Sequence, residues 1–112
     1  MPISEIERHK AERTLREYCS RRTNPAIRDQ LEIVFRLEGN WAFIAERRPD
    51  WRDPSIVRDE DIAKFRFVVK ERAWTLWWRD RNLAWHLWPD CEPAADIAEL
   101  LPIVDSEPIF YG

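Results

Sequence analysis

Residues 73–88 decide the fold of this chain, because they hold five of its seven tryptophans. The stretch reads Ala73-Trp74-Thr75-Leu76-Trp77-Trp78-Arg79-Asp80-Arg81-Asn82-Leu83-Ala84-Trp85-His86-Leu87-Trp88. Aromatic residues favour strands, and a polar run between two aromatic segments is typical of a turn. We therefore predict a β-hairpin here. A buried tryptophan removes on the order of 200 Å² from water, so two or three would dominate the core of a small protein.

The turn of this hairpin decides which side chains after it enter the core. A two-residue turn would place Trp85 and Leu87 on the core face of the sheet. A type I turn followed by a bulge residue, Leu83, would place His86 and Trp88 there instead. We favour the two-residue turn because it keeps apolar side chains with apolar ones.

Alternating apolar residues predict three more strands before the hairpin. Residues 31–38 and 41–48 have the pattern of a hairpin around the two-residue turn Gly39-Asn40. Residues 62–69 have the pattern of a third strand, which a short turn would connect to residue 73. The expected cross-strand pairs are Leu37 with Ala42, Phe35 with Ile44, Phe67 with Trp74, and Phe65 with Leu76.

An N-terminal helix is expected to pack on this sheet. Ser4 and Glu7 have the spacing of a capping box, which predicts a helix from Glu5 to about Arg21. The predicted fold is α+β: this helix on a five-stranded antiparallel β-meander, with a short C-terminal helix. We expect residues 1–112 to form a single domain.

The remaining segments show weaker patterns, and we predict little regular secondary structure for them. Residues 49–61 contain two prolines and predict an irregular connection, with Trp51 packed against the rest of the protein. A weak helix is predicted from Glu92 to about Asp105, and Pro102 should kink or shorten it. The final Ile109-Phe110-Tyr111 is expected either at the sheet edge or in the core.

Composition restricts the possible functions. The net charge is −3, but the chain from Pro89 onward carries six acidic and no basic residues. No apolar run approaches the roughly 20 residues that span a bilayer, and the N-terminus has no signal-peptide pattern, so we expect a cytoplasmic protein without membrane contact. Cys19 and Cys91 are expected to be ordinary thiols unless the fold brings them together, and no spacing predicts a metal or cofactor site.

Several short motifs resemble those of a bacterial family of domains of unknown function. The motifs are Tyr18-Cys19, Arg28-Asp29-Gln30-Leu31-Glu32, Gly39-Asn40, Glu46-Arg47-Arg48-Pro49, Ala63-Lys64-Phe65-Arg66, Trp78-Arg79-Asp80-Arg81-Asn82, Trp85-His86 and Ile109-Phe110-Tyr111-Gly112. They cover nearly the whole chain, and the resemblance implies no activity. The chain departs from the family at Leu83, where the family tends to have glycine, and at Pro102, where it has an ordinary helix former.

The absence of known catalytic motifs disfavours an enzymatic function. The chain has no phosphate-binding glycine loop, no metal-ligand spacing and no nucleophile elbow. The one alternative is a hydrolase-like site in which His86 acts as a base oriented by Asp80 or Glu46. The simpler interpretation is that His86 is a partly buried strand residue bonded to its neighbours.

The second face of the predicted sheet alternates basic and aromatic side chains. Such a face could stack bases of single-stranded nucleic acid, but the acidic tail and a pI of 5.4 oppose phosphate binding. It could instead be covered by the C-terminal helix and residues 49–61. Tryptophan and arginine are also enriched at protein interfaces. The residues of this face are Arg36, Trp41, Phe43, Lys64, Arg66, Thr75, Trp77 and Arg79.

The sequence therefore favours a non-enzymatic protein-interaction module that binds a protein partner or a second copy of itself. Single-stranded nucleic acid on the same face is the alternative. No cofactor and no metal are expected. The predicted contact residues are Arg47, Arg48, Trp51, Arg66, Trp77 and Arg79.

Overall fold

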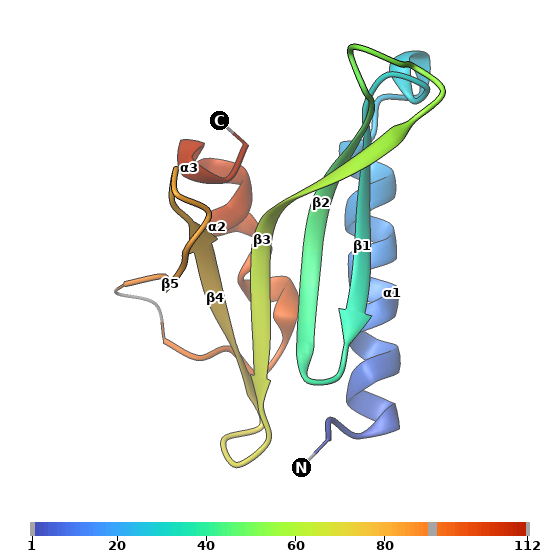
Figure 1. The fold of residues 1–112 in the computed structure, drawn as a ribbon. Coiled ribbons are helices and arrows are strands. Elements are labelled where there is room, and N and C mark those ends of the chain that lie inside the picture. Colours follow the sequence, from blue (N-terminus) through green and yellow to red (C-terminus); the bar gives the residue numbers. More distant parts are fainter. Residues whose placement is uncertain (1, 90–91, 112) are drawn as a thin grey trace.

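A computed structural model describes residues 2–89 and 92–111 (Figure 1). One five-stranded antiparallel sheet, with the strands in sequence order, is backed by the N-terminal helix and by short C-terminal helices. The α+β fold predicted from the sequence is confirmed. The elements are α1 (Glu5–Arg22), η1 (Pro25–Ile27), β1 (Glu32–Glu38), β2 (Trp41–Pro49), β3 (Val57–Val68), β4 (Ala73–Arg79), β5 (Trp85–Leu87), η2 (Ile97–Glu99), α2 (Leu101–Ser106) and α3 (Pro108–Tyr111).

Helix α1 begins as predicted, because the Ser4 side chain accepts a hydrogen bond from the Glu7 backbone N–H. Thr23 caps the C-terminal end of the helix, and its hydroxyl accepts a 3.0 Å hydrogen bond from the backbone N–H of Ile33. A side chain thus replaces a neighbouring strand at the start of β1. Leu15 and Tyr18 of α1 are buried in the same hydrophobic cluster as the sheet residues.

The register of the sheet matches the predicted pairing. Leu37 lies opposite Ala42 and Phe35 opposite Ile44, across the β1–β2 hairpin. Phe67 lies opposite Trp74 and Phe65 opposite Leu76, between β3 and β4. The side chains that this register turns toward the helices form the core of the protein. They include Ile33, Ala42, Ile44, Ala63, Phe65, Phe67, Trp74 and Leu76.

Strand β3 is longer than predicted, because the irregular connection is shorter. Residues 57–61 pair with the end of β2 through a bulge at Ile62, so only residues 50–56 lie outside the sheet. Residues 58–61 are all charged, so apolar alternation does not indicate a strand there. The prediction that Trp51 packs on the fold is wrong, since its side chain is 83% exposed.

Strands β3 and β4 separate beyond the pair Lys64–Trp77. The first half of β3 follows β2 away from β4, while β4 continues beside β5 (Figure 1). The two strands therefore diverge, with α3 at the open end (Figure 1). We call the diverging ends of β2 and β3 with their connection, residues 46–60, the arm.

The turn between β4 and β5 has the bulge geometry, and the preferred two-residue turn is wrong. Leu83 donates its backbone N–H to Asp80 and adopts a positive φ of 67°. Trp85 therefore pairs with Arg79 and lies on the face away from the helices, while His86 pairs with Trp78 on the core side. Turn geometry, rather than the apolar pattern, sets the register here.

Replacing Leu83 with glycine is expected to raise the free energy of unfolding by about 1 kcal/mol, because glycine adopts positive φ without a steric cost. Leu83 is 64% exposed, so little packing is lost. Asn82→Gly in the same turn, where φ is negative, should destabilise the protein instead. Urea denaturation of the two variants checks the prediction, and equal effects from both would contradict it.

The C-terminal region forms three short helical segments in place of one helix from Glu92. Pro102 lies in the first turn of α2, where a proline is tolerated, so α2 begins only at Leu101. The predicted apolar stripe is confirmed as buried: Ile97, Leu100, Leu101 and Val104. Phe110 is buried in the core against Trp88. Cys19 is a buried free thiol, and Cys91 lies outside the described residues, as does any bridge between them.

Candidate functional site

The candidate site is the face of the sheet that points away from the helices. Helices α1 and α2 lie behind the sheet (Figure 1), and their buried residues join the core on that side. In each strand, every second side chain points to the opposite face of the sheet. The C-terminal helix, which was predicted as one possible cover for that face, lies on the other side of the sheet (Figure 1). We call this surface the aromatic–cation face. Its residues are Arg36, Trp41, Phe43, Lys64, Arg66, Trp77, Arg79 and Trp85.

The four rings of this face contact one another edge to face. Trp41 and Trp77 have ring centroids 5.7 Å apart and planes inclined by 66°. Phe43 and Trp85 are 6.4 Å apart at 71°. Such tilted pairs are favourable because the electropositive ring edge meets the electronegative face. The rings come from three strands, β2, β4 and β5, and the contacts hold each of them half-buried.

Lys64 lies at the centre of these rings. Its ammonium nitrogen is 4.2 Å from the ring centroid of Trp41, 4.9 Å from that of Trp85 and 5.5 Å from that of Trp77. The negative ring faces attract the cation. Burial among the rings lowers the pKa of Lys64, and the charge of Asp61 acts in the opposite direction. The face is therefore built as a ring of aromatic side chains around one ammonium group.

Three arginines surround this centre, and two of them are held by carboxylates. The Arg36 guanidinium lies 3.9 Å from the Phe43 ring and donates two hydrogen bonds to Asp61, at 2.6 and 3.0 Å. The hydrogen bonds that Arg36 donates to Asp61 raise the pKa of Arg36. Arg79 donates to Glu60 at 3.3 Å. Arg66 differs, since its guanidinium lies 5.2 Å from the Trp41 ring and is exposed.

Of the six contact residues predicted from the sequence, the structure brings three together on this face: Arg66, Trp77 and Arg79. The other three lie in the arm: Arg47, Arg48 and Trp51. Arg47 donates to both oxygens of Asp59, at 2.8 and 3.0 Å. Arg48 donates to Glu46 at 3.2 Å. These arginines brace the arm with neighbouring carboxylates.

The predicted contact set omitted the centre of the site. Lys64 and Trp41 were already placed on this face by alternation, and that alternation was the signal that could have selected them. Trp85 was assigned to the core because the turn before it was predicted wrongly. The convergence of three rings on one lysine depends on cross-strand register, which no local motif encodes.

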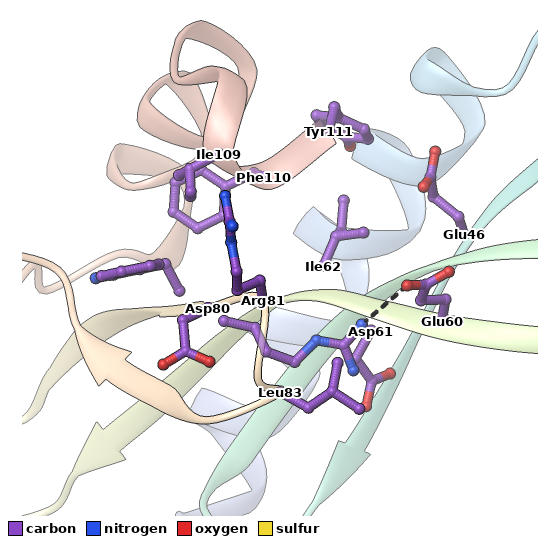
Figure 2. Close-up of a pocket in the computed structure, with 12 residues that line it drawn as sticks. Glu46, Glu60, Asp61, Ile62, Asp80, Arg81, Leu83, Ile109, Phe110 and Tyr111 are labelled. Carbon is purple, nitrogen blue, oxygen red and sulfur yellow. Dashed lines mark hydrogen bonds and ion pairs between the residues drawn. The ribbon is translucent and has the colours of Figure 1, made fainter.

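A cavity of about 640 Å³ adjoins the face where β3 and β4 diverge (Figure 2). Its lining includes Ile62, Phe110 and Tyr111 (Figure 2), and two further lining residues, Arg79 and Glu60, are hydrogen-bonded to each other. Four acidic residues line the cavity, and each is already bonded to a basic partner. The pairs are Glu46 with Arg48, Glu60 with Arg79, Asp61 with Arg36, and Asp80 with His86.

His86 contacts one of the two carboxylates considered for a catalytic role. The distance from His86 Nε2 to Asp80 Oδ2 is 2.6 Å, while Glu46 is bonded to Arg48 instead. The hydrogen bond with His86 is the main cause that lowers the pKa of Asp80. The Asp80 carboxylate also accepts hydrogen bonds from the backbone N–H groups of Asn82 and Ala84, and these bonds close the turn. The contact therefore has a structural role, and catalysis by His86 stays an untested prediction.

Among residues 2–89 and 92–111, no three His, Cys, Asp or Glu side chains are grouped so that they could hold a metal ion. In the same ranges, no helix combines the length and hydrophobicity needed to cross a membrane.

Comparisons with known proteins identify the family of the chain. Neither the curated proteins nor the solved structures contain a match to it. A family model described as Domain of unknown function (DUF3024) matches residues 3–112. The match spans α1 and all five strands, so it includes every residue of the aromatic–cation face. The chain therefore belongs to the DUF3024 family.

Proposed function

We propose that the protein is a non-enzymatic interaction module that binds a protein partner through the aromatic–cation face. The observation that carries this proposal is the position of four rings and four cations outside the helical layer of the chain's own fold. Tryptophan and arginine are the residue types that contribute most to binding at protein interfaces.

The geometry of the face supports binding because its side chains are already ordered. The rings brace one another, and Arg36 and Arg79 are fixed by carboxylates. A surface of this kind loses little side-chain entropy when a partner docks. Leu87, which is 53% exposed and lies opposite Trp77, extends the apolar area of the same face.

Single-stranded nucleic acid is the second candidate, because rings and cations share the face as they do on stacking surfaces. The charges favour it less. Asp61 and Glu60 are bonded to the arginines of the face, so much of its positive charge is already neutralised. Non-specific affinity for nucleic acid comes mainly from cations that remain free to neutralise phosphates.

A reversal of charge at Arg66 tests the proposed function. Immobilised protein and its Arg66→Glu variant are exposed to an extract of the source cells, and Arg13→Glu serves as the matched control on the opposite side. Arg13 is 84% exposed on α1. We expect a protein retained by the parent and by Arg13→Glu but lost from Arg66→Glu, since a rim charge steers and aligns a partner.

Two further measurements separate the alternatives. Retention that nuclease treatment abolishes would favour nucleic acid. Light scattering over a dilution series would reveal self-association as a mass above 13.6 kDa at high concentration. Equal retention by all three proteins would contradict binding through this face.

A further inference from the structure

We infer that the partner segment recognised by the aromatic–cation face is acidic, with a carboxylate held between Lys64 and Arg66 over the ring of Trp41. This inference rests on the proposed function and names the chemistry of the occupant. It follows from which charges of the face are already bonded, from how the two remaining cations are placed, and from the apolar surface beside them.

Some of the cations of the face are paired with carboxylates, and others are not. Asp61 and Glu38 are bonded to Arg36, and Glu60 is bonded to Arg79. Within the described parts of the chain, Lys64 and Arg66 form no ion pair, and both lie over aromatic rings. The carboxylate of Asp61 acts on Lys64 through its charge, but its oxygens are bonded to Arg36. Two adjacent cations thus retain hydrogen-bond donors for a ligand.

The placement of the two cations suits one carboxylate. Lys64 and Arg66 are two residues apart on β3, so they lie on the same side of the strand and roughly 7 Å apart along it. Both reach over the same indole, at 4.2 Å and 5.2 Å from the Trp41 centroid. Both charged groups therefore lie beside the Trp41 ring, at the ends of flexible side chains. A carboxylate that binds beside this ring can accept hydrogen bonds from the ammonium and from the guanidinium.

An acidic peptide fits this arrangement better than a polyanion does. A peptide places one carboxylate at the two cations and turns neighbouring apolar side chains onto Leu87 and the exposed parts of Trp77. A nucleic-acid strand carries a phosphate at every nucleotide and would bring several of them close to Glu38, Glu60 and Asp61. Two copies docked face to face would bring like charges together, which costs free energy.

The acidic C-terminal region of a second copy is a poor occupant, because much of its charge has structural roles. Asp96 and Glu99 form the capping box of η2. Asp105 accepts a 2.8 Å hydrogen bond from the Tyr18 hydroxyl and lies within 3.5–3.8 Å of Arg22 and Arg21. These carboxylates would have to leave their partners to reach another molecule. A separate acidic protein segment is therefore the occupant that we propose.

Three capped peptides that alternate leucine with glutamate, glutamine or lysine test the inference, with an oligothymidylate as the fourth probe. Binding is followed by tryptophan fluorescence and calorimetry. We expect the glutamate peptide to bind at least about tenfold more tightly than the glutamine peptide at low salt, and the lysine peptide most weakly. Lys64→Gln and Arg66→Gln should each reduce the ratio of the two affinities about tenfold, and Arg13→Gln should leave this ratio unchanged.

The outcomes separate this inference from the function on which it rests. Glutamate and glutamine peptides that bind equally, and that both weaken in Trp77→Ala, would refute the acidic preference and leave a protein-binding face. Tighter binding of oligothymidylate through Lys64 and Arg66 would replace the peptide with nucleic acid. Binding of none of the probes would overturn both proposals. Thermal unfolding of each variant verifies that Lys64→Gln and Arg66→Gln remain folded.

Discussion

Replacing Trp74 with alanine is expected to lower the free energy of unfolding by about 3–5 kcal/mol, the largest single effect predicted for this chain. Trp74 is only 2% exposed, and its ring lies 5.1 Å from that of Phe67. Its backbone also exchanges two hydrogen bonds with Ala94, at 2.7 and 2.9 Å, which attach the C-terminal region to β4. The substitution would leave a cavity where the sheet meets that region.

A loss of this size is a large part of the 5–15 kcal/mol that typically stabilises a domain. Urea denaturation followed by circular dichroism measures it, and Trp51→Ala is the matched control. Trp51 is 83% exposed, with Arg52 as its ring partner, so its replacement should cost no more than about 0.5 kcal/mol. Similar costs at the two positions would contradict the placement of Trp74 in the core.

Alkaline pH is expected to destabilise the protein steeply. Burial raises the pKa of the Cys19 thiol from 9.0 to about 12. Burial also raises the pKa of Tyr18, whose hydroxyl is bonded to Asp105 and Tyr111, and it raises the pKa of Tyr111. In each case the folded protein holds a proton that the unfolded chain releases. The stabilisation is therefore complete below the ordinary pKa and is lost as the pH rises above it.

Each such group should lower the free energy of unfolding by about 1.4 kcal/mol per pH unit, from about pH 9 for Cys19 and from about pH 10 for the tyrosines. Lys64 acts in the opposite sense, since its lowered pKa adds stability as the pH rises, but it is one group against three. Urea denaturation between about pH 8 and pH 11 measures the slope. Cys19→Ala should flatten its first part and Tyr18→Phe its second, whereas a flat parent curve would refute the prediction.

The sequence predicts most of the sheet because its strongest signals are local. Gly39 adopts a positive φ of 56° in the turn between β1 and β2, and this turn fixes the register of Phe35 and Leu37. Trp74 and Leu76 then follow from simple alternation after Phe67. Short-range turn chemistry and period-two patterning therefore account for four of the five strands.

The errors arise where strand pairing or turn geometry outweighs the pattern of apolar residues. Residues 58–61 are all charged, yet they form part of a strand because the partner strand β2 continues beside them. Leu83 adopts a left-handed conformation that a leucine disfavours, and this shifts Trp85 to the opposite face. Pairing with β2 sets the backbone geometry at residues 57–61, and the hydrogen-bonded turn from Asp80 to Ala84 sets it at Leu83.

The candidate site could be predicted only in part for the same reason. Alternation places Arg66 and Trp77 on one face, but it does not reveal which face the helices cover. Nor does it reveal that Arg36 is bonded to Asp61, whereas Lys64 is surrounded by rings. The distinction between neutralised and available charge depends on pairings 25 residues apart in sequence, and only the folded structure provides it.

The hydroxyl of Thr23 at the start of β1 blocks one position on an outer edge of the sheet. An outer strand normally exposes a row of unpaired amide groups that can recruit a strand from another molecule. Here the first outward-facing amide of β1 is occupied by a side chain of the same molecule. The opposite margin, β5, has only three residues and offers a short template. The blocked amide of β1 and the shortness of β5 thus each reduce the length of edge with which another molecule could pair.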